Sequence, residues 1–296
     1  TEQDVGIDSL IAHPGIRFSA FNLANFHTVS QELHISPFSS SVWVKDTLTG
    51  IEQGIWLSEA EAEVVSKLVP GQKPSFSIES TVLRRLIAAG ILIDSGEYLS
   101  ELERRGAEIS IARMKFAEDR YAVLTGLFSA PQMRAMQRYY RAYVANGFMP
   151  FGDDQVECRY REHNEPFARL LQGQFAGLMS SITGVAVKLS YVYAASYVGG
   201  SALAPHVDRE QCEYSISFQV DYQPDPPGGI SPWAIYVTPL QNHDELESPG
   251  ERITLAECER QAAAASPMAV NLANGDGLFY MGRELIHYRN ELPAGH

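Results

Sequence analysis

The short motif His206-Val207-Asp208, together with His287 near the end of the chain, limits the possible fold and function of this sequence more than any other feature. Alternate side chains of an extended strand share a face, so His206 and Asp208 point into one cavity while Val207 turns away. Two imidazoles and one carboxylate form the facial ligand set that suits non-haem Fe(II) and leaves coordination positions open. A His-x-Asp pair alone is common by chance, but here a Gly-Asp turn and an apolar strand lead into His287. We therefore predict that His206, Asp208 and His287 bind a metal and form the catalytic centre.

The same three side chains leave other functions open. They could hold zinc in a hydrolase, with water as the fourth ligand. Such a hydrolase needs a general base near the metal, for which Asp221 or Glu210 could be invoked without support from any pattern. A cupin-like binding protein or isomerase is a further alternative.

Two longer segments carry a family resemblance. The first is YVGGSALAPHVD, from Tyr197 to Asp208, and the second is GDGLFYMGRELIHYR, from Gly275 to Arg289. They resemble the two ligand-bearing segments of the 2-oxoglutarate/Fe(II) dioxygenases, particularly the prolyl-hydroxylase-like branch. The intervening SPWAIYV, which begins at Ser231, is similar to a central strand of some members. The resemblance covers about the second half of the chain.

The resemblance implies a fold, a set of cofactors and a reaction. The fold is a C-terminal double-stranded β-helix, the cupin-like jelly roll, flanked by helices. The cofactors are Fe(II), dioxygen and the co-substrate 2-oxoglutarate, which would chelate the metal through its keto and C1 carboxylate oxygens and be converted to succinate. Related halogenases replace the carboxylate ligand, whereas Asp208 is present here, so hydroxylation of an unactivated C–H bond is expected.

The distal carboxylate of 2-oxoglutarate needs a fixed cation, and arginine offers a planar fork with two donors. Arg289 lies two residues after His287 and shares its strand face, so it is the leading candidate, with Arg283 in reserve. Many family members carry this basic residue further along the chain, which leaves both its identity and the last barrel strand open. Tyr197 and Tyr191 share one strand parity and could donate hydroxyls to the co-substrate. They could equally be half-buried strand aromatics.

Composition limits the partners. The chain has 296 residues, 45% of them hydrophobic, as expected of a globular protein with a substantial core. Its formal net charge of −13 argues against binding a nucleic-acid backbone. No apolar run is long enough to span a membrane. We therefore expect a small-molecule or peptide substrate.

The cysteines indicate a compartment. Cys158, Cys212 and Cys258 are odd in number, widely spaced and without a CxxC pair. This pattern predicts neither a disulfide framework nor a thiolate zinc site, and it fits a cytoplasmic protein.

We expect three regions: an N-terminal extension at 1–36, a small αβ domain at 37–105 and the dioxygenase domain at 106–296. In the small domain, two strands at 42–44 and 51–57 surround a turn, and Ser58 with Glu61 caps a first helix. A second helix from about residue 78 ends at Gly90, and a strand follows at 91–93. The pattern resembles a winged helix of the PqqD-like peptide-recognition type, which implies peptide binding; a helical cap on the barrel is the alternative.

The remainder predicts helices followed by strands, giving an α+β fold overall. We expect helices at 97–105, at 131–145, capped by Ser129, and at 164–182, ended by Gly184. Gly106 marks the expected end of the first domain. A short helix capped by Thr254 lies within an insertion. The expected strands lie at 121–128, 187–197, 215–222, 234–237, 269–272, 277–281 and 285–289.

Overall fold

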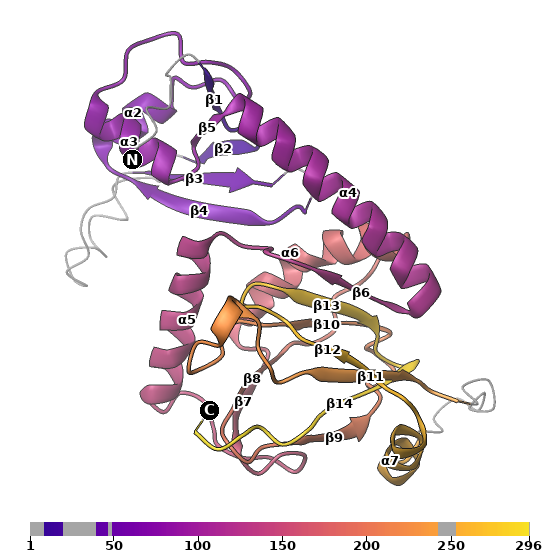
Figure 1. The fold of residues 1–296 in the computed structure, drawn as a ribbon. Coiled ribbons are helices and arrows are strands. Elements are labelled where there is room, and N and C mark those ends of the chain that lie inside the picture. Colours follow the sequence, from indigo (N-terminus) through magenta and orange to yellow (C-terminus); the bar gives the residue numbers. More distant parts are fainter. Residues whose placement is uncertain (1–8, 20–39, 47–48, 242–252, 296) are drawn as a thin grey trace. The chain divides into compact units, whose positions relative to one another are not determined.

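The computed structural model describes residues 9–19, 40–46, 49–241 and 253–295 (Figure 1). The chain divides into two compact units, Thr1–Ala107 and Glu108–His296. The boundary falls inside helix α4, Ser95–Asp119. Among the described residues, no helix combines the length and the apolar character needed to cross a membrane.

The first unit contains two small antiparallel sheets. β2 (Ile16–Ser19), β3 (Ser40–Lys45) and β4 (Glu52–Leu57) form one, in that order. β1 (Leu10–Ala12) pairs with β5 (Leu92–Asp94) in the other. The predicted hairpin is confirmed, since β3 and β4 pair along their whole length.

The helices of the first unit begin close to where capping signals place them. α2 (Glu59–Val65) begins with the predicted capping box of Ser58 and Glu61. α3 (Ser80–Ala88) is capped by the carboxylate of Glu79, and Gly90, with φ of 70°, follows its end. Apolar residues of both helices and of the strands form one buried cluster: Ala12, Val42, Ile55, Leu57, Ala62, Val65, Leu86, Ile91 and Leu92.

Two expectations for this half of the chain differ from the structure. No helix or strand was assigned from the sequence to the N-terminal extension at 1–36, but β1 and β2 lie there, with three and four residues. The rest of that segment is outside the described residues. We expected a helix over 97–105 and the end of the first domain at Gly106, but α4 continues through Gly106 to Asp119. One glycine costs a helix only about 1 kcal/mol relative to alanine, which a helix of 25 residues tolerates. The winged-helix assignment stays a prediction.

Two helices of the second unit match their predicted positions. α5 (Ala130–Ala145) begins at Ser129 with a capping box. α6 (Pro166–Thr183) begins at Glu165 and ends at Gly184, which has φ of 77°. The apolar stripe of α6 is core, as expected: Phe175 packs against Phe218 with ring centroids 5.4 Å apart.

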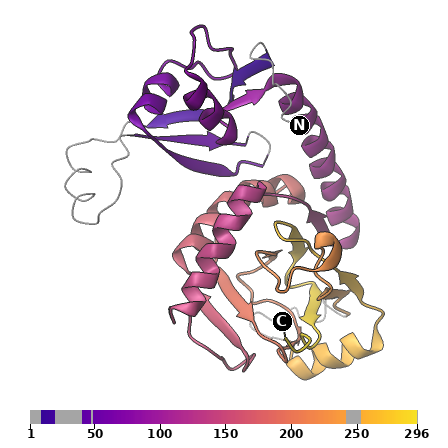
Figure 2. The same ribbon diagram turned by 60° about the vertical axis from the view of Figure 1, so that its left-hand side comes forward.

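Two antiparallel sheets of the second unit pack face to face (Figures 1 and 2). The first has the order β12 (Met268–Val270), β11 (Ile235–Pro239), β14 (Leu285–Arg289) and β9 (Leu203–His206). The second has the order β10 (Tyr214–Phe218), β13 (Gly277–Met281) and β6 (Tyr121–Leu124). Their facing side chains form a buried core: Ile235, Val237, Val270, Leu272, Leu278, Tyr280 and Leu285. This is the layered architecture expected of a jelly roll.

Smaller elements complete the second unit. β7 (Arg159–His163) and β8 (Tyr193–Tyr197) form an antiparallel pair. α7 (Leu255–Ala264) begins at Thr254, as predicted. Its residues Cys258 and Ala262 pack with Ile286 of β14 and with Val207, so Val207 does turn away from its two neighbours.

Several strands are shorter than the sequence predicted. The expected strand at 187–197 exists only from Tyr193 onward, which leaves Tyr191 before it. The strand expected at 121–128 ends at Leu124, and the one at 215–222 runs from Tyr214 to Phe218. Strand propensity continues beyond these ends, but pairing partners do not, and pairing decides where a strand stops.

Candidate metal centre and its cavity

His206 and His287 are brought together by strand pairing. His206 ends β9, His287 lies in β14, and the two are direct cross-strand partners. Directly opposed residues of an antiparallel pair project to the same face. Their ring centroids are accordingly 4.2 Å apart.

Both imidazoles are held in the same tautomer by the backbone. Nδ1 of His206 lies 2.8 Å from the Ala204 carbonyl oxygen, and Nδ1 of His287 lies 3.0 Å from that of Leu285. A carbonyl can only accept, so Nδ1 of each ring carries a proton, and Nε2 is the nitrogen that faces the possible metal position. Burial, with His287 close by, lowers the pKa of His206 to about 4, so this ring is neutral near neutral pH. Neutral imidazole nitrogen is the form that binds metals.

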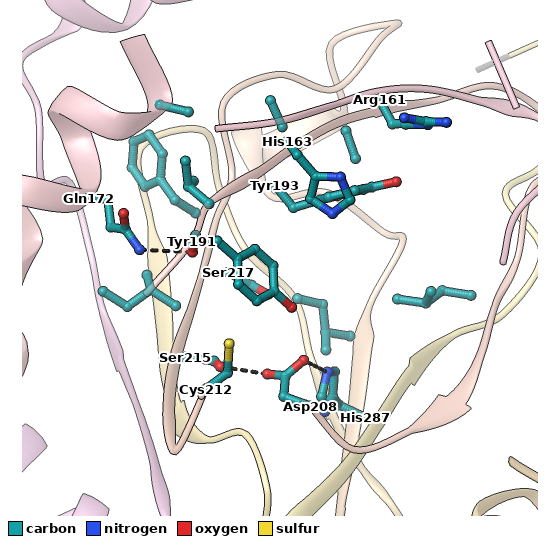
Figure 3. Close-up of a pocket in the computed structure, with 18 of the residues that line it drawn as sticks. Arg161, His163, Gln172, Tyr191, Tyr193, Asp208, Cys212, Ser215, Ser217 and His287 are labelled. Atoms are coloured by element: carbon teal, nitrogen blue, oxygen red, sulfur yellow. Dashed lines mark hydrogen bonds and ion pairs between the residues drawn. The ribbon is translucent and has the colours of Figure 1, made fainter. Parts of the chain in front are cut away.

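Asp208 lies in the turn after β9, where its backbone N–H donates to the Gly282 carbonyl at 2.7 Å. The Ser215 hydroxyl donates to Oδ2, while Oδ1 lies 3.6 Å from Nε2 of His287 (Figure 3). Burial would raise the pKa of Asp208, but His287 and Ser215 together bring it below its usual value. The side chain is therefore an anionic ligand with one oxygen turned toward the imidazoles.

One ligand atom from each of His206, Asp208 and His287 lies within 4.8 Å of the other two. Among the described residues, this is the one group of three or more His, Cys, Asp or Glu side chains that could hold a metal. Two imidazoles and one carboxylate fit Fe(II) with open coordination positions. The donor chemistry therefore suits the metal that the sequence predicted.

Gly282 shapes the site from behind the carboxylate, and sequence reasoning missed it. A Cβ atom at this position would lie 2.4 Å from Asp208 Oδ2, 2.6 Å from Ser215 Oγ and 2.7 Å from the Cys212 carbonyl oxygen. No L side chain fits at these distances. Glycine is required because the backbone passes directly against the ligand carboxylate.

The three ligands open into a cavity of about 1860 Å³. The predicted co-substrate residues Arg289, Tyr197 and Tyr191 also line this cavity. Arg283 does not: it is exposed, in the turn between β13 and β14, outside the cavity lining. Strand parity explains the difference, since Arg289 shares a face with His287 and Arg283 lies beyond the strand.

Arg289 is largely enclosed and has no acidic partner. Its guanidinium carbon lies 4.3 Å from the centroid of the Trp233 ring, and Nη1 donates to the Trp233 carbonyl at 2.6 Å. No carboxylate within the described ranges pairs with it. Burial lowers the pKa of Arg289 to about 10, which still leaves it charged at neutral pH. A desolvated cation without a counter-ion is costly, so this arrangement favours a bound anion.

The two candidate tyrosines occupy different surroundings. Tyr197 lies on β8 with its ring edge-on to Trp233, at a centroid distance of 5.0 Å, and its hydroxyl accepts a hydrogen bond from Arg159 at 2.9 Å. Tyr191 faces Cys212 near Asp208 (Figure 3). Burial and then Cys212 raise the pKa of Tyr191 to about 12, so its hydroxyl stays protonated.

Sequence reasoning also missed Arg159 and Trp233. Trp233 belongs to a segment that resembled a family strand, but no role was assigned to its ring. Arg159 gave no signal, because its cross-strand partner Tyr197 is distant in sequence and the pairing of β7 with β8 brings them together. Neither residue could have been found from local spacing.

The fold and the site together define an α+β protein whose β-sandwich carries a His-Asp-His site suited to a metal ion. No family model matches this chain, and a search of curated proteins finds no match. Solved structures do resemble it. A Pseudomonas putida prolyl-4-hydroxylase is 12% identical, with 64% of this chain and 92% of that chain covered and a TM-score of 0.44.

Two further structures show a similar degree of likeness. A Trichoplax adhaerens prolyl hydroxylase, in complex with a hypoxia inducible factor peptide fragment, is 9% identical, covering 66% of this chain and 87% of that one, with a TM-score of 0.48. The epimerase SnoN, in complex with Fe3+, alpha ketoglutarate and nogalamycin RO, is 14% identical, covering 63% and 78%, with a TM-score of 0.47. Every one of these TM-scores is below 0.5, so the functional argument rests on the site itself.

Proposed function

We propose that this protein is an Fe(II)- and 2-oxoglutarate-dependent oxygenase with a double-stranded β-helix domain, and that it hydroxylates an unactivated C–H bond. One observation carries the proposal. A single cavity presents an anionic metal-ligand set in His206, Asp208 and His287, together with an enclosed arginine, Arg289, that has no counter-ion among the described residues. A keto acid could bind a metal ion held by these ligands, and its distal carboxylate could pair with Arg289.

Each part of the site has a distinct role in the proposal. The Nε2 atoms of His206 and His287 and the carboxylate of Asp208 would hold iron, which when bound supplies the chemistry with dioxygen. Arg289 would bind the distal carboxylate of 2-oxoglutarate through charge-assisted hydrogen bonds. The enclosed walls would orient the co-substrate and limit access of water.

The proposed substrate is a peptide, an amino acid or a natural-product intermediate. The cavity of about 1860 Å³ exceeds the range of roughly 300–1,000 Å³ that is typical of small-ligand pockets. This leaves ample room for a substrate beside the co-substrate. The free Cys158, Cys212 and Cys258 support a reducing, cytoplasmic setting.

The first unit is proposed to bind peptide, as a PqqD-like winged-helix domain would. Two features support this role: β4 ends its sheet, with β3 as its one neighbour in the described chain, and Trp56 on β4 is exposed. An edge strand can accept an extended peptide by strand addition. Titration of candidate peptides into the full chain should give a saturable change in tryptophan fluorescence that is lost in Trp56→Ala. No saturable change would indicate a structural cap.

A zinc hydrolase or a non-catalytic cupin-like protein has less support from the geometry. Of the two general bases that could be invoked, Asp221 accepts two hydrogen bonds from Arg141, at 2.7 and 2.8 Å, and Glu210 is exposed. Neither is free and enclosed beside the metal ligands, as a general base would need to be.

The direct test measures conversion of 2-oxoglutarate to succinate by the purified chain. With Fe(II) and dioxygen, we expect iron-dependent succinate from the native chain and none above background from Asp208→Ala. Asp221→Ala is the matched control, because it removes a carboxylate that is already paired with Arg141. If the native chain forms no iron-dependent succinate and retains zinc at the site, the hydrolase is favoured instead.

A further inference from the structure

Arg159 is a second enclosed arginine of the cavity, and it differs from Arg289 in being neutralised. Its side chain is 4% exposed, and it forms an ion pair with Asp153 at 2.7 Å. Hydrogen bonds from Tyr193, backbone amides and Arg159 hold the pKa of Asp153 well below its usual range despite burial. The charge of Arg159 is therefore already balanced, and its remaining donors serve another purpose.

Those donors hold two tyrosine hydroxyls of the same strand. Nη1 of Arg159 donates to the Tyr197 hydroxyl at 2.9 Å, and Nη2 donates to the Tyr193 hydroxyl at 3.0 Å. The Tyr193 hydroxyl donates its own hydrogen bond to the Asp153 carboxylate. The Tyr193 hydroxyl is thus satisfied both as acceptor and as donor.

The Tyr197 hydroxyl accepts a hydrogen bond from Arg159, but its own proton is in a different position from that of Tyr193. Within the described part of the chain, its proton has no acceptor. A phenol has one proton to donate, and the bond from Arg159 occupies a lone pair on its oxygen. The proton is therefore directed away from Arg159 while the phenol stays held in place.

Tyr197 lies close to the enclosed guanidinium of Arg289. The Tyr197 ring packs edge-on against Trp233, and the Arg289 guanidinium lies over that same indole. Both side chains line the cavity. A hydroxyl whose proton has no acceptor and a guanidinium with no carboxylate partner, as far as the described residues go, thus share one wall. A carboxylate can accept from both.

We propose that Arg159 is a positioning residue, which orients the Tyr197 hydroxyl so that it donates to the carboxylate bound by Arg289. This inference rests on the proposed function, because the carboxylate is the distal one of 2-oxoglutarate. The Arg159–Tyr197 pair would then contribute to selectivity: the site would bind a keto acid with a charged far end more tightly than one of equal length with an uncharged far end.

The test compares two phenol-to-phenyl changes on one strand. Calorimetric titration of 2-oxoglutarate into the full chain loaded with Mn(II), without dioxygen, measures binding independently of turnover. Tyr197→Phe should weaken binding at least about tenfold, because a hydrogen bond to a charged group is lost. Tyr193→Phe removes a hydroxyl held by the same arginine, and it should change affinity by less than about twofold. Affinity for 2-oxopentanoate, whose far end is uncharged, should not change in either variant.

A second pair of variants separates positioning from a structural role. Arg159→Lys keeps the ion pair with Asp153 but loses the fork that reaches Tyr197, so it should weaken 2-oxoglutarate binding several-fold. Added to Tyr197→Phe, it should cause little further loss, because Arg159 acts through that hydroxyl. Additive losses, or equal losses for 2-oxopentanoate, would show that Arg159 supports the fold alone.

The outcomes also distinguish this inference from the proposed function. If the native chain binds 2-oxoglutarate with Mn(II) and Tyr197→Phe binds it equally well, the positioning role is wrong and the proposed function stands. If the native chain does not bind 2-oxoglutarate at all, both are wrong. Should Arg159→Lys not fold, the comparison of Tyr197→Phe with Tyr193→Phe still decides.

Discussion

The cavity has two ends that are built in different ways. At the metal end, His206, Asp208 and His287 each make a backbone hydrogen bond, to Ala204, Gly282 and Leu285 in turn, and they present acceptors. At the cation end, Arg289 and Tyr197 are held largely by other side chains and present donors. The metal end is therefore fixed largely by backbone hydrogen bonds and strand pairing, and the cation end largely by contacts between side chains.

The largest effect should come from removing the carboxylate of the metal end. Asp208→Ala leaves two imidazoles and no anionic ligand, so we expect Mn(II) or Fe(II) affinity to fall by more than about 100-fold, beyond the loss typical of an outer-shell change. Equilibrium dialysis measures this loss. The cation end should stay intact, and circular dichroism should show a folded protein. If Asp208→Ala retained the metal, the carboxylate would not be needed for metal binding, and the proposed role of the metal end would be wrong.

The reciprocal change at the cation end should spare the metal. Arg289→Met removes the paired donors expected to hold the distal carboxylate, so 2-oxoglutarate affinity should fall about 100-fold. Mn(II) affinity should change by less than about twofold. Because the arginine has no counter-ion in the described structure, replacing it with an apolar side chain should leave the melting temperature unchanged or raise it.

Arg283→Met is the matched control for that change, since Arg283 is exposed and outside the cavity lining. It should bind 2-oxoglutarate as the native chain does. An equal loss in the two variants would mean that net charge, and not the position of Arg289, attracts the co-substrate.

A smaller effect should follow from crowding the metal end without removing a ligand. In Gly282→Ala the new Cβ would meet Asp208 Oδ2 at 2.4 Å, so the carboxylate must shift. We expect metal affinity about tenfold lower, as for other changes behind a ligand. Gly177→Ala is the control: nothing lies within 4 Å of its added Cβ, and in helix α6 it should stabilise by up to about 1 kcal/mol. Unchanged metal affinity in Gly282→Ala would show that the site tolerates a displaced Asp208.

The smallest effect on the site should come from a buried carboxylate whose hydrogen bonds are all internal. Glu165 accepts from the hydroxyls of Tyr139 and Tyr140 and from the amides of Phe167 and Ala168. Glu165→Gln should lower the free energy of unfolding at pH 7 by about 1–2 kcal/mol and leave metal affinity unchanged. Urea denaturation of both proteins measures the difference.

The pH dependence of that difference has a defined sign. Burial would raise the pKa of Glu165, but its hydrogen bonds bring it below the ordinary value of 4.5. A lowered pKa in the folded state means that the carboxylate stabilises the fold above the unfolded pKa. That contribution is lost as pH falls through the lower, folded pKa. The gap between Glu165→Gln and the native chain should therefore narrow in acid, and a gap that widens would contradict this.

Features encoded by neighbouring residues could be predicted from the sequence. The capping box at Ser58, the helix start at Ser129 and the helix end at Gly184 each depend on contacts within a few residues. The proposed metal ligands could also be singled out from the sequence, because His206 and Asp208 are two residues apart. Asp208, however, lies in the turn after β9 and not on the strand. Here local chemistry and the final fold agree.

Features that depend on distant partners could not be predicted. β1 is three residues long and exists through pairing with β5, far along the chain. Arg159 meets Tyr197 across a strand pair, and Gly282 is needed because a separate turn brings Asp208 against it. Tyr191 was placed on a strand by alternation alone, yet no partner strand reaches it. Tertiary context decides each of these.

The direct pairing of His206 with His287 has a consequence for assembly of the sheet. β9 is the outermost strand of its sheet as far as the chain is described, and β14 is its neighbour there. An ion bound by these two histidines would hold β9 in register against β14. Without the metal, β9 would separate from β14 more often and expose a sheet edge to other chains. The metal-free protein should therefore aggregate more readily than the metal-bound protein.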